Sequence, residues 1–349
     1  MVTAGRWLFQ EPPRRVAVLR ALKLGDLLCA VPAFRAFRAA WPDAELLLIG
    51  LPWARAVAER LPHYLDGFRE LPGWPGLPER ERQIDRAPAF LAAMRAERLD
   101  LVLQLHGSGR VTNPLALLLG GRRTAGFYGP GDFCPDPDWF CPWPESGLEV
   151  HRLLRLPEFL GLPVPGDDLE FPLTDDDFRA LRAVPGAEAL EPGGYACVHP
   201  GASVPERRWP PERFAAVADA LAGRGLRVVL TGSAGEAGLT RAVAAAMRAP
   251  AVDLAGRTGL GPLGALVSGA RLLVCNDTGV SHLAAALGVP SVVLATGDHP
   301  ARWAPADRRR HRVLCRAGGA TAAEALAAAD GLLAAGEALP RPVLQRSFE

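Results

Sequence analysis

The chain has 349 residues, of which 49% are apolar, and a formal net charge of +1. This length fits two domains of ordinary size better than one large domain. A net charge near zero excludes the general electrostatic footprint of a nucleic-acid-binding protein, so no nucleic-acid partner is expected. Six cysteines are scattered singly, without the paired spacing of a zinc site, so we expect reduced thiols and no metal.

Apolar runs in the chain are too short or too broken to cross a membrane. Residues 46–54 are too few, and residues 260–275 are interrupted by Arg271, whereas a span needs about 18 apolar residues. The N-terminal segment, with Arg6 and Pro12, lacks the apolar stretch of a secretory signal. We therefore expect a cytoplasmic protein.

Short apolar runs alternate with helical patterns from end to end. The predicted strands are residues 15–20, 45–50, 100–105, 195–199, 226–231, 271–276 and 290–295. Residues 27–40, 211–224 and 236–248 repeat apolar side chains at three- and four-residue spacing, which predicts amphipathic helices. Such alternation is typical of βα units with parallel strands, so we predict an α/β fold with helices on both faces of each sheet.

The composition changes in the middle of the chain, between about residues 127 and 192, where Pro and Gly interrupt the pattern. We predict an N-terminal domain over residues 1–185 and a C-terminal domain over residues 186–349. Segments 149–162 and 174–184 are predicted helices of the first domain or its hinge. A final Ala-rich helix, residues 321–335, is expected to pack back on the first domain.

The segment 276–282, NDTGVSH, directly follows a predicted strand and opens a helix. A helix N-terminus presents free N–H groups and a partial positive charge, which suit a phosphate. Thr278 adds a hydroxyl, Gly279 allows close backbone approach, and His282 lies one turn inside the helix. The segment therefore suits a diphosphate, although spacing alone fits a capped helix with a buried histidine equally well.

Two further loops follow predicted strands, where open α/β sheets bind ligands. The loop 199–210 carries Arg207 and Arg208, and either would stabilise charge on a departing phosphate or simply be solvated. In the loop 231–236, Glu236 would accept hydrogen bonds from ribose hydroxyls or favour the helix N-terminus that it begins.

The segment 24–28, LGDLL, follows the first predicted strand but lacks the glycines of a dinucleotide-binding fingerprint. A carboxylate at the end of a strand is placed to take a proton from a hydroxyl group. Asp26 is therefore a candidate general base, and a plain N-cap role is the alternative. Lys23, the single lysine of the chain, lies close to it.

Together these segments resemble the heptosyltransferase family, glycosyltransferase family 9, whose members add heptose from ADP-heptose to the lipopolysaccharide core. In the first half the matching pieces are RALKLGDLL (20–28), 31–36, 103–108 and 120–127. In the second half they are HPG (199–201), RRWP (207–210), 231–233, 254–258 and NDTGVSHL (276–283).

The resemblance implies the GT-B architecture, two Rossmann-like domains facing each other across a cleft, with the acceptor on the first and the nucleotide sugar on the second. It also implies an inverting, metal-independent transfer that needs no cofactor besides the nucleotide sugar substrate, ADP-heptose. Asp26 matches the family's catalytic aspartate, and Arg207 lies where the family has a basic residue for the phosphates. The diphosphate-binding segment is matched by Thr278, Gly279 and His282.

The same resemblance assigns the nucleoside to the second domain. Glu236 matches a ribose-binding glutamate, Gly256 and Thr258 are expected near the base, and Ser233 is expected to line the same part of the site. On the acceptor side the expected residues are Lys23 and Gln104.

The aromatic, Pro-rich segment 127–144 departs from the lipopolysaccharide enzymes of the family, which leaves the acceptor open. A glycan, a lipid-linked glycan and a small natural product are the alternatives, and for a small natural product or an envelope glycan the donor would be another nucleotide sugar. Sugar-nucleotide epimerisation and non-catalytic binding are the competing functions. If the acceptor is a lipid, peripheral membrane contact is expected through helix 27–40, which carries Arg35 and Arg38.

Overall fold

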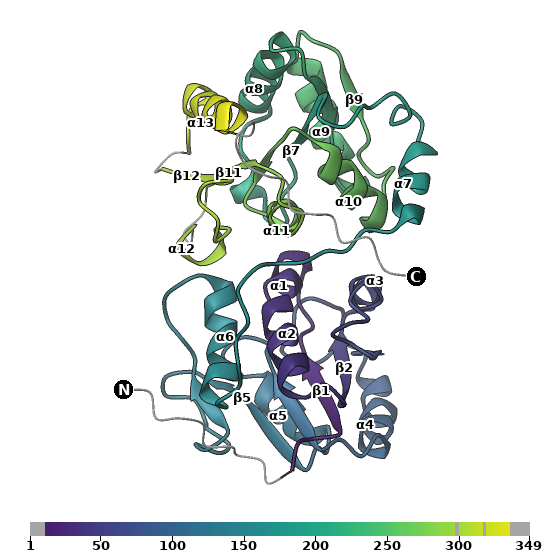
Figure 1. Cartoon of the computed structure of the whole chain (residues 1–349), viewed down its shortest axis with the longest axis vertical. Helices are drawn as coiled ribbons and strands as arrows, with labels where there is room; N and C mark the ends of the chain where they lie inside the picture. Colours follow the sequence, from purple (N-terminus) through teal and green to yellow (C-terminus); the bar gives the residue numbers. More distant parts are fainter. Residues whose placement is uncertain (1–10, 297–299, 317–318, 336–349) are drawn as a thin grey trace. The chain divides into compact units, whose positions relative to one another are not determined.

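The computed structural model describes residues 11–296, 300–316 and 319–335 (Figure 1). By their internal contacts the residues form two compact units, Met1–Leu169 and Glu170–Glu349. This division falls earlier in the chain than the expected boundary at 185/186.

The first unit is built on a six-stranded sheet in which every neighbouring pair of strands is parallel. The strands are β1 (Arg15–Leu19), β2 (Glu45–Gly50), β3 (Gly67–Glu70), β4 (Leu101–Gln104), β5 (Arg123–Tyr128) and β6 (Phe140–Pro142). Their order, β3-β2-β1-β4-β5-β6, is the doubly wound pattern 3-2-1-4-5-6. The direction of winding reverses between β1 and β4, and the loops that follow these two strands therefore flank the switch point.

Helices cover both faces of this sheet. They are α1 (Leu24–Leu28), α2 (Val31–Ala40), η1 (Pro52–Ala54), α3 (Arg55–Ala58), η2 (Ile84–Arg86), α4 (Ala87–Ala96), α5 (Thr112–Leu118) and α6 (Glu149–Phe159). Met94 of α4 and Leu115 of α5 share a buried core with Ala17 and Leu19 of β1, while α2 packs against α6. Because β1 is covered on both sides, its side chains form a continuous apolar run rather than an alternating one.

The helix predicted over residues 27–40 is two helices, α1 and α2, separated by Cys29 and Ala30. Pro32 is the reason, because proline has no N–H to donate to the carbonyl four residues earlier and is tolerated only in the first turn of a helix. Asp26 therefore lies in a short helix of its own.

The second unit repeats the same plan with an all-parallel six-stranded sheet of order β12-β11-β10-β7-β8-β9. The strands are β7 (Tyr195–His199), β8 (Arg227–Leu230), β9 (Ala251–Asp253), β10 (Leu272–Asn276), β11 (Ser291–Ala295) and β12 (His311–Cys315). Here the winding reverses between β7 and β10, which places the switch point at the carboxyl ends of these two strands.

The helices of the second unit again cover both faces. They are α7 (Asp175–Arg182), η3 (Pro205–Arg207), α8 (Pro211–Gly223), η4 (Ala234–Glu236), α9 (Ala237–Ala246), α10 (Leu260–Gly269), α11 (Gly279–Ala286), α12 (Pro300–Trp303) and α13 (Ala322–Ala335). Phe214 of α8, Val243 of α9 and Leu332 of α13 belong to one buried core. Helix α10 packs on α7 and α11 instead.

Contacts of α7 explain why the division falls before this helix. It packs on α10 of the second unit, and Phe171 and Leu173, which precede it, lie against Gly264 of α10. A Cβ atom on Gly264 would come within 2.8 Å of the Phe171 ring, so the absence of a side chain there allows the segment to lie close to α10. The capping box of Thr174 and Asp177 begins α7.

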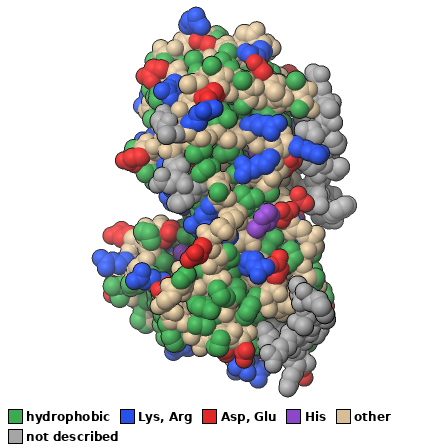
Figure 2. Space-filling model, turned by 90° about the vertical axis from the view of Figure 1, so that its left-hand side faces the viewer, with side chains coloured by type: hydrophobic (Ala, Val, Ile, Leu, Met, Phe, Trp, Pro, Cys, Tyr) green, Lys and Arg blue, Asp and Glu red, His purple; other side chains and the backbone are tan. Residues whose placement is uncertain are grey.

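The final helix, α13, packs on α8 and β11 of its own unit. In the described ranges no helix has the length and apolar character to cross a membrane. On the face shown in Figure 2, acidic, basic and apolar side chains are interspersed.

The arginines of α2 do not form the exposed surface that was expected to contact a membrane. Arg35 donates to the Tyr64 hydroxyl at 3.0 Å and to the Asp168 carbonyl at 2.7 Å. Arg38 donates to the carbonyl of Ala44 at 2.7 Å and also pairs with a carboxylate of the same unit. Both guanidinium groups therefore bind neighbouring loops of the protein.

Candidate active site

The residues predicted to bind the donor lie in loops at the carboxyl ends of β7, β8, β9 and β10. One buried side chain, Asn276 at the end of β10, binds the loop after β7 across the switch point. Its Oδ1 accepts a hydrogen bond from the Trp209 backbone at 3.0 Å, and its Nδ2 donates to the carbonyls of Pro200 at 2.8 Å and Gly201 at 3.4 Å. Because Asn276 is fully buried, this amide fixes the loop after β7 against the end of β10.

Helix α11 begins at Gly279, directly after β10, with Thr278 as its N-cap residue in an extended conformation. The Thr278 side chain makes no capping hydrogen bond, while its carbonyl accepts from the Ser281 backbone and hydroxyl at 2.9 and 2.8 Å. The amino end of α11 thus combines free N–H groups with a hydroxyl that does not cap the helix. These are the features that suit a diphosphate.

His282 is buried in the second turn of α11, 4% exposed, and its ring meets the edge of the Trp303 ring at a centroid distance of 6.3 Å. The structure therefore supports the buried position that was the plain alternative.

Arg207 ends the short helix η3 in the loop after β7 and is partly exposed. Burial raises the pKa of the Asp277 carboxyl, and the positive charge of Arg207 opposes that rise. The charge of Arg207 therefore acts on Asp277, the residue before the N-cap of α11.

Ser233 and Glu236 form a reciprocal capping box at the start of η4. The Ser233 backbone N–H and hydroxyl both donate to Glu236 Oε2 at 2.8 Å. The other oxygen, Oε1, lies against Gly201, where an added Cβ atom would come within 2.2 Å of it. Glu236 therefore performs the structural role that was the alternative interpretation, and Oε1 is the oxygen left for a ribose.

Burial disfavours the charged form of Glu236, yet the hydrogen bonds from Ser233 and the charges of His199 and Arg208 outweigh it and lower its pKa. Burial also lowers the pKa of His199, opposed by the charge of Glu236. The ring of His199 is held by a hydrogen bond between its Nδ1 and the Thr231 hydroxyl at 3.1 Å. The Glu236 carboxylate and the His199 ring therefore influence each other's ionisation between the loops after β7 and β8.

Gly256 and Thr258 follow β9. The Gly256 N–H donates to the carbonyl of Gly232 at 2.8 Å, which joins this loop to the one that carries Glu236. Gly256 has a φ of +71°, and a Cβ atom there would lie 2.8 Å from the backbone of Ala234. The backbone conformation and the close approach both require glycine.

In the first unit, the buried side chain of Arg20 organises the switch point. Its guanidinium donates to the Asp26 carbonyl at 3.1 and 2.8 Å and to the Leu105 carbonyl. It also lies 3.8 Å from Asp26 Oδ1 and 3.3 Å from Glu149 Oε1, while Arg152 lies 3.8 Å from the other Glu149 oxygen. The carboxylate of Asp26, whose side chain is 21% exposed, is thus held at the end of β1 beside a buried cation.

A second carboxylate interacts with Asp26. Burial and the negative charge of Asp26 raise the pKa of Glu79, while Lys23 opposes this. Glu79 Oε2 is buried without a hydrogen-bond partner. Lys23 itself is exposed at the N-cap of α1.

Gln104, predicted on the acceptor side, is fully buried at the end of β4. Its Nε2 donates to Thr112 Oγ1 at 2.5 Å and to the carbonyl of His106 at 3.1 Å. The side chain therefore supports the turn after β4 and cannot contact an acceptor in this conformation. Because both faces of β4 are covered, the Gln104 side chain is buried within the unit.

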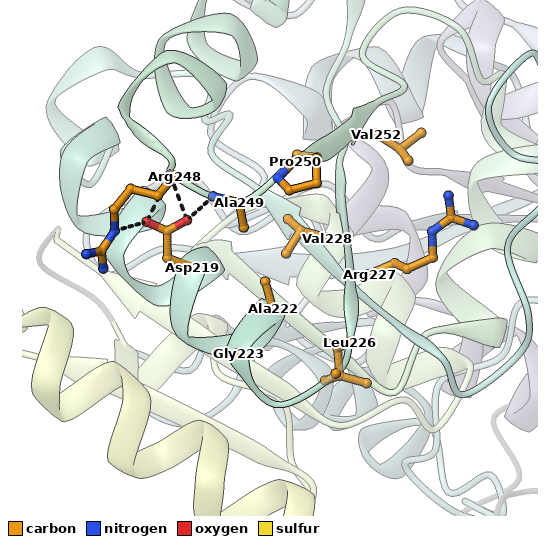
Figure 3. Close-up of a pocket in the computed structure, with 12 residues that line it drawn as sticks. Asp219, Ala222, Gly223, Leu226, Arg227, Val228, Arg248, Ala249, Pro250 and Val252 are labelled. Carbon is orange, nitrogen blue, oxygen red and sulfur yellow. Dashed lines mark hydrogen bonds and ion pairs between the residues drawn. The ribbon is translucent and has the colours of Figure 1, made fainter.

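The second sheet also has a pocket at the end opposite to the predicted donor loops. A pocket of about 580 Å³ lies at the amino ends of β8 and β9, lined by Leu226, Arg227 and Ala251 among others. Figure 3 shows the Asp219 carboxylate turned towards Arg248 and Ala249, whose backbone N–H groups donate to it at 2.9 to 3.1 Å. This pocket is therefore at the opposite end of the strands from the predicted donor loops, away from where parallel sheets bind ligands.

Comparison with known proteins identifies the family. The sequence model of glycosyltransferase family 9 (heptosyltransferase) matches residues 89–325, which is more than half of the chain. The chain belongs to this family. The resemblance inferred from the sequence motifs is thereby confirmed, and the protein is a glycosyltransferase.

Relatives of this glycosyltransferase match it over most of their length. Lipopolysaccharide heptosyltransferase 2 of Salmonella typhimurium is 26% identical over 311 residues, which cover 82% of this chain and 84% of the relative. A family 9 glycosyl transferase from Veillonella parvula superposes with a TM-score of 0.80 at 23% identity, covering 92% of this chain and 97% of that one. The Escherichia coli ADP-heptose lipopolysaccharide heptosyltransferase II superposes with a TM-score of 0.73 at 21% identity, covering 93% and 99%. These likenesses confirm the predicted fold class, two Rossmann-like α/β domains of the GT-B type.

The structure adds residues that the sequence interpretation missed. Arg20, Glu149 and His106 form the polar environment of the first switch point, and Asn276 connects the loops of the second. Arg20 and Asn276 lie inside motifs that the sequence showed, at the ends of strands. The sequence did not show that their side chains are buried. Glu149 had no such signal, because its partner lies far away in the sequence.

Proposed function

We propose that this glycosyltransferase moves heptose from ADP-heptose to a hydroxyl of a lipopolysaccharide-type glycan, with inversion at the anomeric carbon and without a metal. The observation that carries the donor half is the amino end of α11, where Thr278 and Gly279 offer a hydroxyl and free N–H groups. The charge of Arg207 acts on Asp277, which precedes this end of the helix. The heptose and the acceptor class follow the names of the family and of the relatives.

The reaction is a single displacement. The acceptor oxygen forms a bond to the anomeric carbon as the bond between that carbon and the diphosphate oxygen breaks, and the hydroxyl proton passes to the Asp26 carboxylate. ADP leaves with the electron pair, and Arg207 and the N-terminus of α11 stabilise its charge. Glu236 Oε1, Gly256 and Thr258 are proposed to bind the nucleoside.

Asp26 is supported as the base by its position. Its backbone is held by Arg20, and its carboxylate is partly exposed at the carboxyl end of β1. Lys23 precedes it and is proposed to bind the acceptor. We further propose a cytoplasmic location with peripheral contact to the membrane that carries a lipid-linked acceptor.

The proposal is tested with purified protein, ADP-heptose and a deacylated lipopolysaccharide core oligosaccharide. We expect ADP release that requires the oligosaccharide, together with a product heavier by one heptose. Thermal-shift titrations with ADP, UDP and GDP sugars should show stabilisation by the ADP sugar, because a ligand that binds the folded state raises its stability. Conversion of the donor to another sugar nucleotide without acceptor would instead establish an epimerase, and no binding of any nucleotide would overturn the proposal.

A further inference from the structure

The turn after β4 contains a buried histidine whose ring and main chain are both held by hydrogen bonds. His106 is 8% exposed, and its Nδ1 accepts a hydrogen bond from the Ala21 backbone N–H at 3.2 Å. Its own carbonyl accepts from Gln104 Nε2 and Thr112 Oγ1, each at 3.1 Å. The main chain and the ring of His106 are therefore both held before any substrate arrives.

The hydrogen bond from Ala21 determines the tautomer of this ring. A nitrogen that accepts a hydrogen bond cannot carry a proton, so the proton of the neutral ring lies on Nε2. Burial, reinforced by the positive charge of Arg20, lowers the pKa of His106 to about 3. The ring therefore stays neutral near pH 7 and can donate a hydrogen bond but cannot act as a base there.

The donor nitrogen remains free for a ligand. Nε2 forms no hydrogen bond within the described part of the chain, and it is not one of the buried unpartnered atoms, so it meets solvent. His106 follows β4, and Ala21 lies between β1 and the helix that carries Asp26. Arg20 connects the two sides, because it donates to the carbonyls of both Leu105 and Asp26.

We propose that His106 is an acceptor-binding residue whose Nε2–H donates a hydrogen bond to a second oxygen of the acceptor sugar, beside the hydroxyl that Asp26 deprotonates. This inference rests on the proposed function, since it takes the first unit as the acceptor side. A neutral donor fixed at the strand end fits a sugar hydroxyl or ring oxygen. It would orient the attacking hydroxyl, and Gln104, which was expected to bind the acceptor itself, would act through His106.

Two substitutions separate the two ring nitrogens. His106→Asn places an amide oxygen near the position of Nδ1. The Ala21 N–H therefore keeps an acceptor, while the Nε2–H donor is removed. His106→Gln reaches further and places an amide N–H near the position of Nε2. If His106 only supported the turn, Asn would be the better replacement; if it binds the acceptor, Gln would be.

Both variants are compared with the wild-type chain, using ADP-heptose and the deacylated core oligosaccharide as probes. We expect His106→Asn to lower kcat/KM for the oligosaccharide about three- to tenfold, the range for one neutral hydrogen bond, with KM for ADP-heptose unchanged. His106→Gln should stay within about twofold of wild type. NMR of histidine-labelled protein should show the Nε2–H tautomer between pH 5 and 8.

The inference is overturned if His106→Asn matches the wild type with the oligosaccharide, if His106→Gln is impaired as much as His106→Asn, or if the ring gains a proton above pH 5. A wild-type chain that binds ADP-heptose but not the oligosaccharide overturns this inference and leaves the donor assignment intact. Failure to bind ADP-heptose overturns the proposed function itself.

Discussion

The buried amide of Asn276 accepts a hydrogen bond from the backbone of Trp209 at 3.0 Å and donates one to the carbonyl of Pro200 at 2.8 Å. Through these bonds a residue of β10 fixes the loop that follows β7 across the switch point.

Asn276→Ala should therefore lower both stability and donor affinity. It leaves the Trp209 N–H and the Pro200 carbonyl without partners in a buried region, which costs about 1–3 kcal/mol per unsatisfied group. Urea unfolding measures the stability, and calorimetric titration with ADP measures the affinity. An unchanged free energy of unfolding would contradict the structural role of Asn276.

Gly201→Ala tests the contact between the loop after β7 and Glu236. The new methyl group would meet Oε1 at 2.2 Å, so the carboxylate must turn away, and nucleotide affinity should fall by about tenfold, equal to the loss of about 1.4 kcal/mol. The matched control is Gly223→Ala at the end of α8, where an added Cβ atom meets nothing within 4 Å. Equal ADP affinity of the two variants would remove Glu236 from the nucleotide site.

Asp26→Asn keeps the shape of the side chain and removes its basicity. Turnover should fall about 10²- to 10⁴-fold, the usual effect of losing a general base, while the dissociation constant for ADP-heptose stays the same. Asp85→Asn, at an exposed position in the same unit, is the control and should keep full turnover. Normal kcat in Asp26→Asn would refute the assignment of the base.

Glu149→Ala removes the carboxylate that lies 3.3 Å from the buried guanidinium of Arg20. Breaking a buried ion pair on one side costs about 3–5 kcal/mol, because the remaining charge loses its partner. Turnover should fall too, since Arg20 holds the backbone of Asp26.

The control for Glu149→Ala lies in the same helix. Glu158 pairs with Arg155 at 2.6 Å, but both side chains are well exposed, so Glu158→Ala should change stability by less than about 1 kcal/mol. Chemical denaturation of both variants makes the comparison. Similar unfolding free energies would show that the pair of Arg20 and Glu149 contributes little.

Acid should destabilise the protein through its buried histidines. Burial lowers the pKa of His106 to about 3 and that of His311 to about 4, and it lowers the pKa of His199 as well. In the unfolded chain these rings take up protons below about pH 6.5. The contribution of these histidines to the free energy of unfolding is therefore fully present above pH 6.5. It is lost as the pH falls towards their pKa values in the folded protein.

The contribution of one histidine to this pH dependence can be measured by comparing a variant with the wild type. His106→Asn should reduce the slope of unfolding free energy against pH by about 1.4 kcal/mol per pH unit between pH 4 and 6. His63→Asn, at an exposed position, is the control. Identical slopes for wild type and His106→Asn would mean that the ring is protonated in the folded state over this range.

Much of the fold could be predicted from the sequence, because buried parallel strands leave continuous apolar runs and the helices between them leave regular apolar spacing. Pro32 shows where the pattern misled: the apolar spacing of residues 27–40 is continuous, yet the missing N–H divides the helix. The contacts divide the chain at 169/170 and not at the predicted 185/186, because α7 packs on α10, and nothing local in the sequence indicates that contact.

For the candidate site, the sequence by itself predicted which loops carry the chemistry. NDTGVSH, HPG and LGDLL each follow a strand, and their chemistry is local: a helix N-terminus, a glycine that allows close approach, and a carboxylate at a strand end.

Only the tertiary structure decided which contacts each polar side chain makes. Arg20 and Glu149 meet across more than a hundred residues of chain, and Asn276 meets Trp209 and Pro200 from another strand. Gln104 turns inward, while His106, two residues later, keeps one nitrogen open to solvent. Burial and hydrogen-bond partners set these roles, and both arise from contacts between segments that are distant in sequence.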